Sequence, residues 1–122
     1  MQFDQETKGE VLVVRLLEEN VSSHEAPELK TALLGFLMRD EKKILLNLKD
    51  VQNMDSTGLG ALLFGIRQAQ RYGKDMRFSD AQSKVQFLIR IAQLQDVIGV
   101  YPTEQEALKA FGADRTDGKA AT

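Results

Sequence analysis

The side chains best suited to chemistry stand together in residues 55–60, whose sequence is Asp-Ser-Thr-Gly-Leu-Gly. An apolar run ends shortly before this segment and a helical pattern begins within it, so the chain passes here from a strand into a helix. The first N–H groups of a helix are unpaired and carry partial positive charge, so Asp55, Ser56 or Thr57 can serve as the N-cap. The same position accommodates a phosphate, either bound as a ligand or attached to a hydroxyl. Ser56 is therefore the first candidate for a functional residue.

Other chemistries find little support among the residues present. The glycines at 58 and 60 lack the lysine and spacing of a P-loop and the full dinucleotide fingerprint. The chain has no cysteine and a single histidine, His24, which excludes a thiolate site and a histidine metal cluster. Ser56 is not flanked by the Gly-x-Ser-x-Gly pattern of a hydrolase nucleophile. We therefore expect a protein that is not an enzyme and that binds no metal or cofactor.

Composition favours one soluble domain. A chain of 122 residues with 43% hydrophobic content suits a single compact core. Its formal net charge of −2 offers no general attraction to nucleic acid or to an anionic membrane. Residues 1–8 lack the basic start and apolar core of a signal peptide, and no apolar run approaches the ~20 residues of a membrane span. We expect a cytoplasmic protein with neither nucleic acid nor membrane as a direct partner.

The N-terminal half predicts a hairpin, a helix and a buried strand. A short alternating segment, a Lys-Gly turn and the aliphatic run 11–17 predict two antiparallel strands. A helix is predicted from residues 24–26 to Met38, because Pro27 is tolerated in a first helical turn and apolar residues then recur at threes and fours. The predicted inner stripe of this helix is Ala26, Leu29, Leu33, Phe36 and Leu37. The nearly continuous apolar run 43–48 predicts a central strand that is buried on both faces.

The helix predicted over residues 57–72 has two different faces. Residues placed at ~100° intervals around its axis put Leu59, Leu62, Leu63, Ile66 and Gln70 in one sector. The opposite sector is small and polar apart from Phe64, which forms a shallow apolar step suited to a binding hot spot. Gly58 and Gly60 allow close packing or the close approach of a partner to the helix backbone. We assign the partner-binding surface to Gly58, Gly60, Ala61, Phe64 and Arg67.

The C-terminal half predicts a strand at 75–78, a helix at 85–94 and a short strand at 97–101. The apolar residues of helix 85–94 spread over more than one stripe. Phe87 with Ile91 is therefore a candidate for a surface covered by another chain, as in a homodimer, or by the C-terminal helix.

A last helix is predicted after the capping box Thr103-Glu104-Gln105-Glu106, with its end at Gly112. Residues 113–122 have too little apolar content to order themselves. We expect a single domain over residues 1–112 and a mobile tail over 113–122. Strands that alternate with helices define the α/β class. The predicted fold is a mixed sheet of about four to five strands with an antiparallel N-terminal hairpin, covered by about four helices.

The motif and the order of the elements resemble the STAS family, the anti-sigma-factor antagonists of bacteria. The likeness rests on residues 55–60, placed between a strand and a helix, and spans roughly residues 11–111. Supporting matches are Ala26-Pro27-Glu28-Leu29 at the first helix, Tyr72-Gly73 after the motif helix and Glu106-Ala107-Leu108 near the end.

This resemblance implies a phosphorylation switch. In such antagonists the serine that follows the aspartate is the phosphoacceptor for a partner anti-sigma factor that is itself a serine kinase, and Ser56 is the matching residue. The unmodified antagonist binds that kinase and frees a sigma factor. Phosphate on the serine abolishes binding, and a separate serine phosphatase restores it.

Several interpretations of the motif remain open at the level of sequence. Ser56 is either the phosphoacceptor or only the N-cap. Asp55 orients Ser56, binds a metal during phosphoryl transfer on the partner, or forms the turn. Thr57 is a second hydroxyl site or packs in the first helical turn. The alternative function is an STAS accessory or scaffold subunit of a transporter or signalling complex, without a phosphoswitch.

Overall fold

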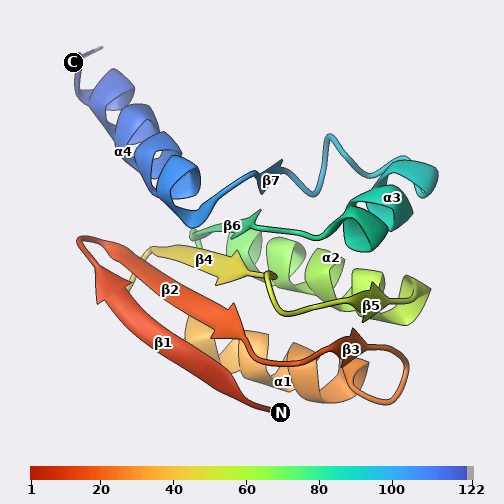
Figure 1. Cartoon of the computed structure of the whole chain (residues 1–122). Coiled ribbons are helices and arrows are strands. Elements are labelled where there is room, and N and C mark those ends of the chain that lie inside the picture. The colour runs from red at the N-terminus through yellow and green to blue at the C-terminus, as the bar shows by residue number, and fades with distance from the viewer. Residues whose placement is uncertain (121–122) are drawn as a thin grey trace.

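The computed structural model describes residues 1–120, with side chains described for residues 1–112. The elements follow in the order β1 (Phe3–Lys8), β2 (Val11–Leu16), β3 (Asn20–Val21), α1 (Ala26–Leu37), β4 (Lys43–Asn47), β5 (Asn53–Met54), α2 (Ser56–Arg71), β6 (Asp75–Ser79), α3 (Ser83–Ile91), β7 (Val100–Tyr101) and α4 (Glu104–Ala120) (Figure 1). The main sheet has the strand order β1-β2-β4-β6-β7, in which the β1-β2 pair is antiparallel and the other pairs are parallel. The predicted mixed sheet with an N-terminal hairpin is confirmed.

Different helices cover the two faces of this sheet, with α1 and α2 on one side and α4 on the other (Figure 1). Successive residues of a strand point to opposite faces. Val14 and Leu46 accordingly belong to the larger core cluster, whereas Val13 and Leu45 pack with Phe111 of α4. Leu45 and Leu46 are both fully buried, which confirms a central strand buried on both faces.

The first helix follows its sequence pattern closely. It begins at Ala26, carries Pro27 in its first turn, and ends at Leu37. Its buried residues are Ala26, Leu29, Leu33, Phe36 and Leu37, the predicted inner stripe without exception. Burial of one apolar stripe against the sheet therefore accounts for this element.

The C-terminal helix starts as predicted but ends later. The backbone N–H of Glu106 donates to Oγ1 of Thr103 over 3.1 Å, as in a capping box. The helix continues to Ala120, so the predicted end at Gly112 is wrong. A glycine inside a helix costs only about 1 kcal/mol relative to alanine and is not an obligatory end. The predicted mobile tail over residues 113–122 lies outside the residues whose side chains are described, so it stays a prediction.

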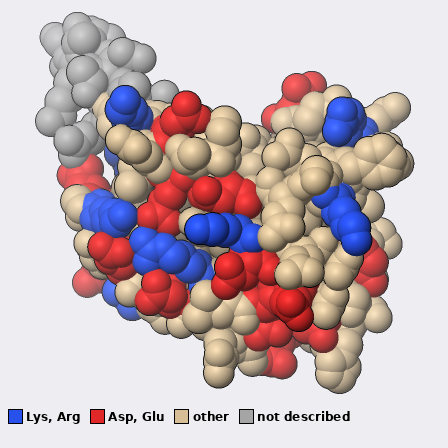
Figure 2. Space-filling view, viewed as in Figure 1, with Lys and Arg blue, Asp and Glu red and all other residues tan. Residues whose placement is uncertain are grey.

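Charged side chains fasten the start of α4 to the hairpin. The Glu104 carboxylate accepts hydrogen bonds from Lys8 Nζ at 3.0 Å, from Arg15 Nε and Nη2 at 3.0 and 2.8 Å, and from Asn47 Nδ2 at 2.8 Å. Acidic and basic side chains are intermingled over this part of the molecule (Figure 2). The hydrogen bonds from Arg15, and after them those from Asn47 and Lys8, hold the pKa of Glu104 at about 2, although partial burial opposes this shift.

This cluster predicts an acid-sensitive contribution to stability. A carboxyl whose pKa is lowered on folding stabilises the native state above its unfolded pKa of 4.5, and the contribution fades as the pH falls toward the folded value. Because Lys8 and Arg15 are partly exposed, we expect a contribution of about 2 kcal/mol. Glu104→Gln should therefore lose stability at neutral pH and show a flatter pH profile than wild type. Urea unfolding between about pH 7 and pH 2.5 measures this, with exposed Asp96→Asn as the control. Parallel profiles for wild type and Glu104→Gln would contradict it.

Candidate functional site

The start of α2 is held beside a loop that is distant in sequence. The short strands β3 and β5 pair in parallel, with Asn20 opposite Asn53 and Val21 opposite Met54. This pairing sets the loop at residues 22–25 against α2, where the backbone N–H of Ser23 donates to Asp55 Oδ2 over 3.2 Å. The surface around the motif therefore consists of the start of α2 and the loop at residues 22–25. Sequence reasoning missed Ser23 and this loop, because strands of two residues carry no periodic pattern.

Asp55 is the N-cap of α2. Its Oδ1 atom accepts hydrogen bonds from the backbone N–H groups of Thr57 at 2.9 Å and Gly58 at 3.1 Å. The Thr57 hydroxyl also donates to Oδ1. These hydrogen bonds, with that of the Thr57 hydroxyl first, lower the pKa of Asp55 below its ordinary value. Both carboxylate oxygens of Asp55 are thus engaged within the protein, and of the three candidate caps Asp55 is the one that the structure shows.

Ser56 is the first residue of α2, and its side chain is exposed. Within the described residues its hydroxyl makes no hydrogen bond. Thr57 is exposed too, but its hydroxyl is bound to Asp55. The structure therefore distinguishes the two hydroxyls of the motif: Thr57 completes the cap, and Ser56 is available to solvent.

This division predicts different responses of the thermal midpoint to alanine at neighbouring positions. Asp55→Ala removes the acceptor of the first-turn N–H groups and the bond to Ser23, so we expect a fall in the thermal midpoint of about 3 to 6 °C. Ser56→Ala removes a hydroxyl without a partner and should leave the midpoint within about 1 °C. Differential scanning calorimetry of the two variants beside wild type measures both shifts. Equal losses in the two variants would mean that Ser56 also contributes to the cap.

The outer face of α2 contains only part of the predicted partner-binding surface. Arg67 is exposed, and Gly60 and Phe64 are half-buried. A side chain at Gly60 would meet no atom within 4 Å, so the backbone there is open to close approach. Lys30 of α1 lies over the Phe64 ring, with Nζ 5.6 Å from its centroid. Gly60, Phe64 and Arg67 lie on the same outer side of α2 as Ser56.

Gly58 and Ala61 do not belong to that surface, and their assignment to it is wrong. Ala61 is fully buried, and a Cβ atom on Gly58 would lie 2.2 Å from the carbonyl oxygen of Val21. The buried arc of α2 is centred differently from the predicted one and consists of Gly58, Leu59, Ala61, Leu62, Gly65 and Ala69. Small residues are needed on this arc because α2 packs closely on α1, β3 and β6.

The described residues contain no group of three or more His, Asp or Glu side chains placed to hold a metal ion. No helix among them combines the length and the apolar character needed to cross a membrane.

The chain belongs to the STAS domain family, whose profile matches residues 2–107. Among curated proteins it is similar to the anti-sigma F factor antagonist of Paenibacillus polymyxa. The two are 29% identical over 109 residues, a region that covers 88% of this chain and 92% of the relative.

Solved structures show the same fold. An anti-sigma factor antagonist from Mycobacterium paratuberculosis aligns with a TM-score of 0.79 at 20% identity, over 89% of this chain and 92% of that one. The Bacillus cell fate determinant SpoIIAA in its phosphorylated form aligns with a TM-score of 0.65 at 19% identity, over 90% and 99% of the two chains.

Proposed function

We propose that this protein is a cytoplasmic anti-sigma-factor antagonist that binds an anti-sigma-factor serine kinase and is switched off by phosphorylation of Ser56. It would thereby regulate sigma-factor-dependent transcription, as a binding module and not as an enzyme. The observation that supports this most directly is the exposed Ser56 hydroxyl, which has no hydrogen-bond partner among the described residues, in a chain of the STAS family. Its likeness to an anti-sigma F factor antagonist supplies the class of partner.

The local geometry explains how one phosphate could abolish binding. The kinase would transfer the γ-phosphoryl group of ATP to Ser56 Oγ, with release of ADP and the hydroxyl proton. The new group carries a charge of about −1.5 to −2. The N–H groups of Thr57 and Gly58 already donate to Asp55, so neither is free to bind the phosphate. The charge would stand unneutralised beside the Asp55 carboxylate.

A partner that covers this surface would have to bury that charge. Burial of an ion without a counter-ion costs several kcal/mol, which is enough to dissociate a complex of ordinary affinity. The fold itself should tolerate the phosphate, because Ser56 is exposed and lies at the positive end of the helix dipole. A serine phosphatase would hydrolyse the exposed ester and restore the hydroxyl.

Mass spectrometry tests this function directly. The purified chain is incubated with ATP and, in turn, with each purified anti-sigma-factor kinase of the source organism. We expect one phosphate on wild type, located at Ser56, none on Ser56→Ala, and wild-type behaviour for Thr57→Val. Phosphate confined to another residue, or no phosphate with any kinase, would overturn the phosphoswitch and favour an accessory or scaffold function.

A further inference from the structure

The outer face of α3 is unusually apolar. Phe87 is 57% exposed and Ile91 is 62% exposed, and in the following loop Val97 is 53% exposed. Phe87 and Ile91 are four residues apart and so lie on the same side of the helix, while Val85 and Ile89 point into the core. Single exposed apolar side chains are ordinary, but two large ones on the same side of one helix indicate a binding surface.

The C-terminal helix does not cover this patch. Its described residues Ala107 and Phe111 pack with Val13 and Leu45 on the sheet, and α4 and α3 lie at opposite ends of the molecule (Figure 1). The sequence-based alternative in which the last helix shields Phe87 and Ile91 is therefore wrong.

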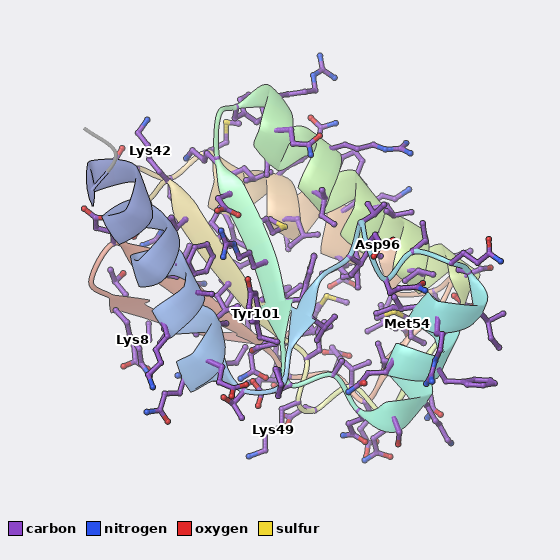
Figure 3. The ribbon with its side chains drawn as sticks, turned by 90° about the horizontal axis from the view of Figure 1, so that it is seen from above. Lys8, Lys42, Lys49, Met54, Asp96 and Tyr101 are labelled. Carbon is purple, nitrogen blue, oxygen red and sulfur yellow. The ribbon has the colours of Figure 1, made fainter. Side chains whose placement is uncertain are left out.

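The helix that carries this patch lies next to the motif. Helix α3 packs against β5, and Lys84 Nζ donates to Asn53 Oδ1 over 3.2 Å. Met54 lies beside α3 when the molecule is viewed from above (Figure 3), and Ser56 follows two residues later. One partner seated on Ser56 can therefore reach α3 without crossing another element of the fold.

Charge decides which occupant fits. Helix α3 carries two cations, Lys84 and Arg90, and no acidic side chain. At this corner of the molecule basic side chains stand among uncharged residues, with an acidic side chain close by (Figure 2). A second copy packed on the patch would oppose two cations with two cations. The exposed side chains of Phe87 and Ile91 also fall well short of the ~800 Å² per partner that a stable dimer buries.

We propose that Phe87 and Ile91 form a second anchor for the regulatory kinase that engages Ser56, seated in an apolar groove of that kinase edged by acidic side chains. The proposal rests on the function assigned to Ser56 and extends its surface across β5 to α3. The surface around Ser56 and the patch on α3 together offer a larger contact area than either one alone. Because Phe87 lies outside the motif, this anchor would help to select which kinase the antagonist recognises.

Serine substitutions on the outer face of α3 test the anchor. Phe87→Ser and the double variant Phe87→Ser/Ile91→Ser are compared with Met38→Ser, which alters a side chain of similar exposure, 61%, at the far end of α1. Each variant is titrated by calorimetry with the purified anti-sigma-factor kinase that binds wild type most tightly. We expect at least about 10-fold weaker binding for Phe87→Ser, a larger loss for the double variant, and a change within about twofold for Met38→Ser. Thermal midpoints should match wild type.

Several results would overturn the anchor. One is an unchanged kinase affinity in the double variant. Another is a wild-type protein that sediments as a dimer while the double variant sediments as a monomer, since a second copy would then be the occupant.

The phosphoswitch is tested by separate outcomes. Normal phosphorylation of Ser56 with unchanged affinity in the double variant would remove the anchor and keep the switch. Affinity that depends on Phe87 without phosphate on Ser56 would keep the anchor and remove the switch.

Discussion

We expect Ser56→Glu to lower the affinity for the proposed regulatory kinase at least about 100-fold, while the free energy of unfolding changes by less than about 0.5 kcal/mol. The carboxylate lies at the first position of α2, where the N–H groups of Thr57 and Gly58 already bind Asp55. It therefore meets the partner as an unneutralised charge in a contact that excludes water. Calorimetric titration with the kinase gives the affinity, and urea unfolding gives the stability.

The matched control for this charge is Gln70→Glu. Gln70 is exposed on the same helix near its other end, so the control adds the same charge away from the motif, and we expect less than about a threefold change in affinity. The scaffold interpretation expects a different order of sensitivity. If Ser56→Glu binds like wild type while Phe64→Ala binds weakly, the helix face is a docking surface without a phosphoswitch.

Gly58→Ala should destabilise the fold by about 3 kcal/mol, the upper end of the range for overpacking. A Cβ atom at this position would lie 2.2 Å from the backbone oxygen of Val21 and 2.9 Å from Cγ of Met54. The first of these atoms is main chain and cannot move aside without separating β3 from α2. The motif needs a glycine here for internal packing, not for approach by a partner.

Gly60→Ala provides the comparison two residues further along. No atom would lie within 4 Å of the new methyl group, so relief of the glycine's entropy cost in the helix should stabilise the protein by about 0.5 to 1 kcal/mol. The two substitutions are chemically identical, and the difference between their urea unfolding free energies isolates the contact with Val21. Similar stabilities for the two variants would contradict the packing argument.

Local periodicity alone was sufficient to predict much of the architecture. The stripe of α1 and the run that forms β4 match the buried residues seen in the structure, because an element that must hide one or both faces shows this in its apolar spacing. The capping box at Thr103 likewise acts within one turn and is readable without knowing the fold. The motif at 55–60 located the start of α2 and marked Ser56 as a candidate site.

Other features depend on contacts between distant parts of the chain. The pairing of β3 with β5 brings the backbone N–H of Ser23 onto the second carboxylate oxygen of Asp55, a contact that the sequence of the motif does not contain. Ala61 is buried because α2 packs on neighbouring elements, and an ideal helical projection contains no neighbours. The exposed patch at Phe87 was visible in sequence only as an excess of apolar residues. The sequence by itself determined the fold class and the candidate serine. The bond from the Thr57 hydroxyl to Asp55, which leaves the Ser56 hydroxyl free, lies within the motif itself. The tertiary structure decided which glycine is internal, since the atom that a side chain at Gly58 would meet belongs to Val21, far away in the chain.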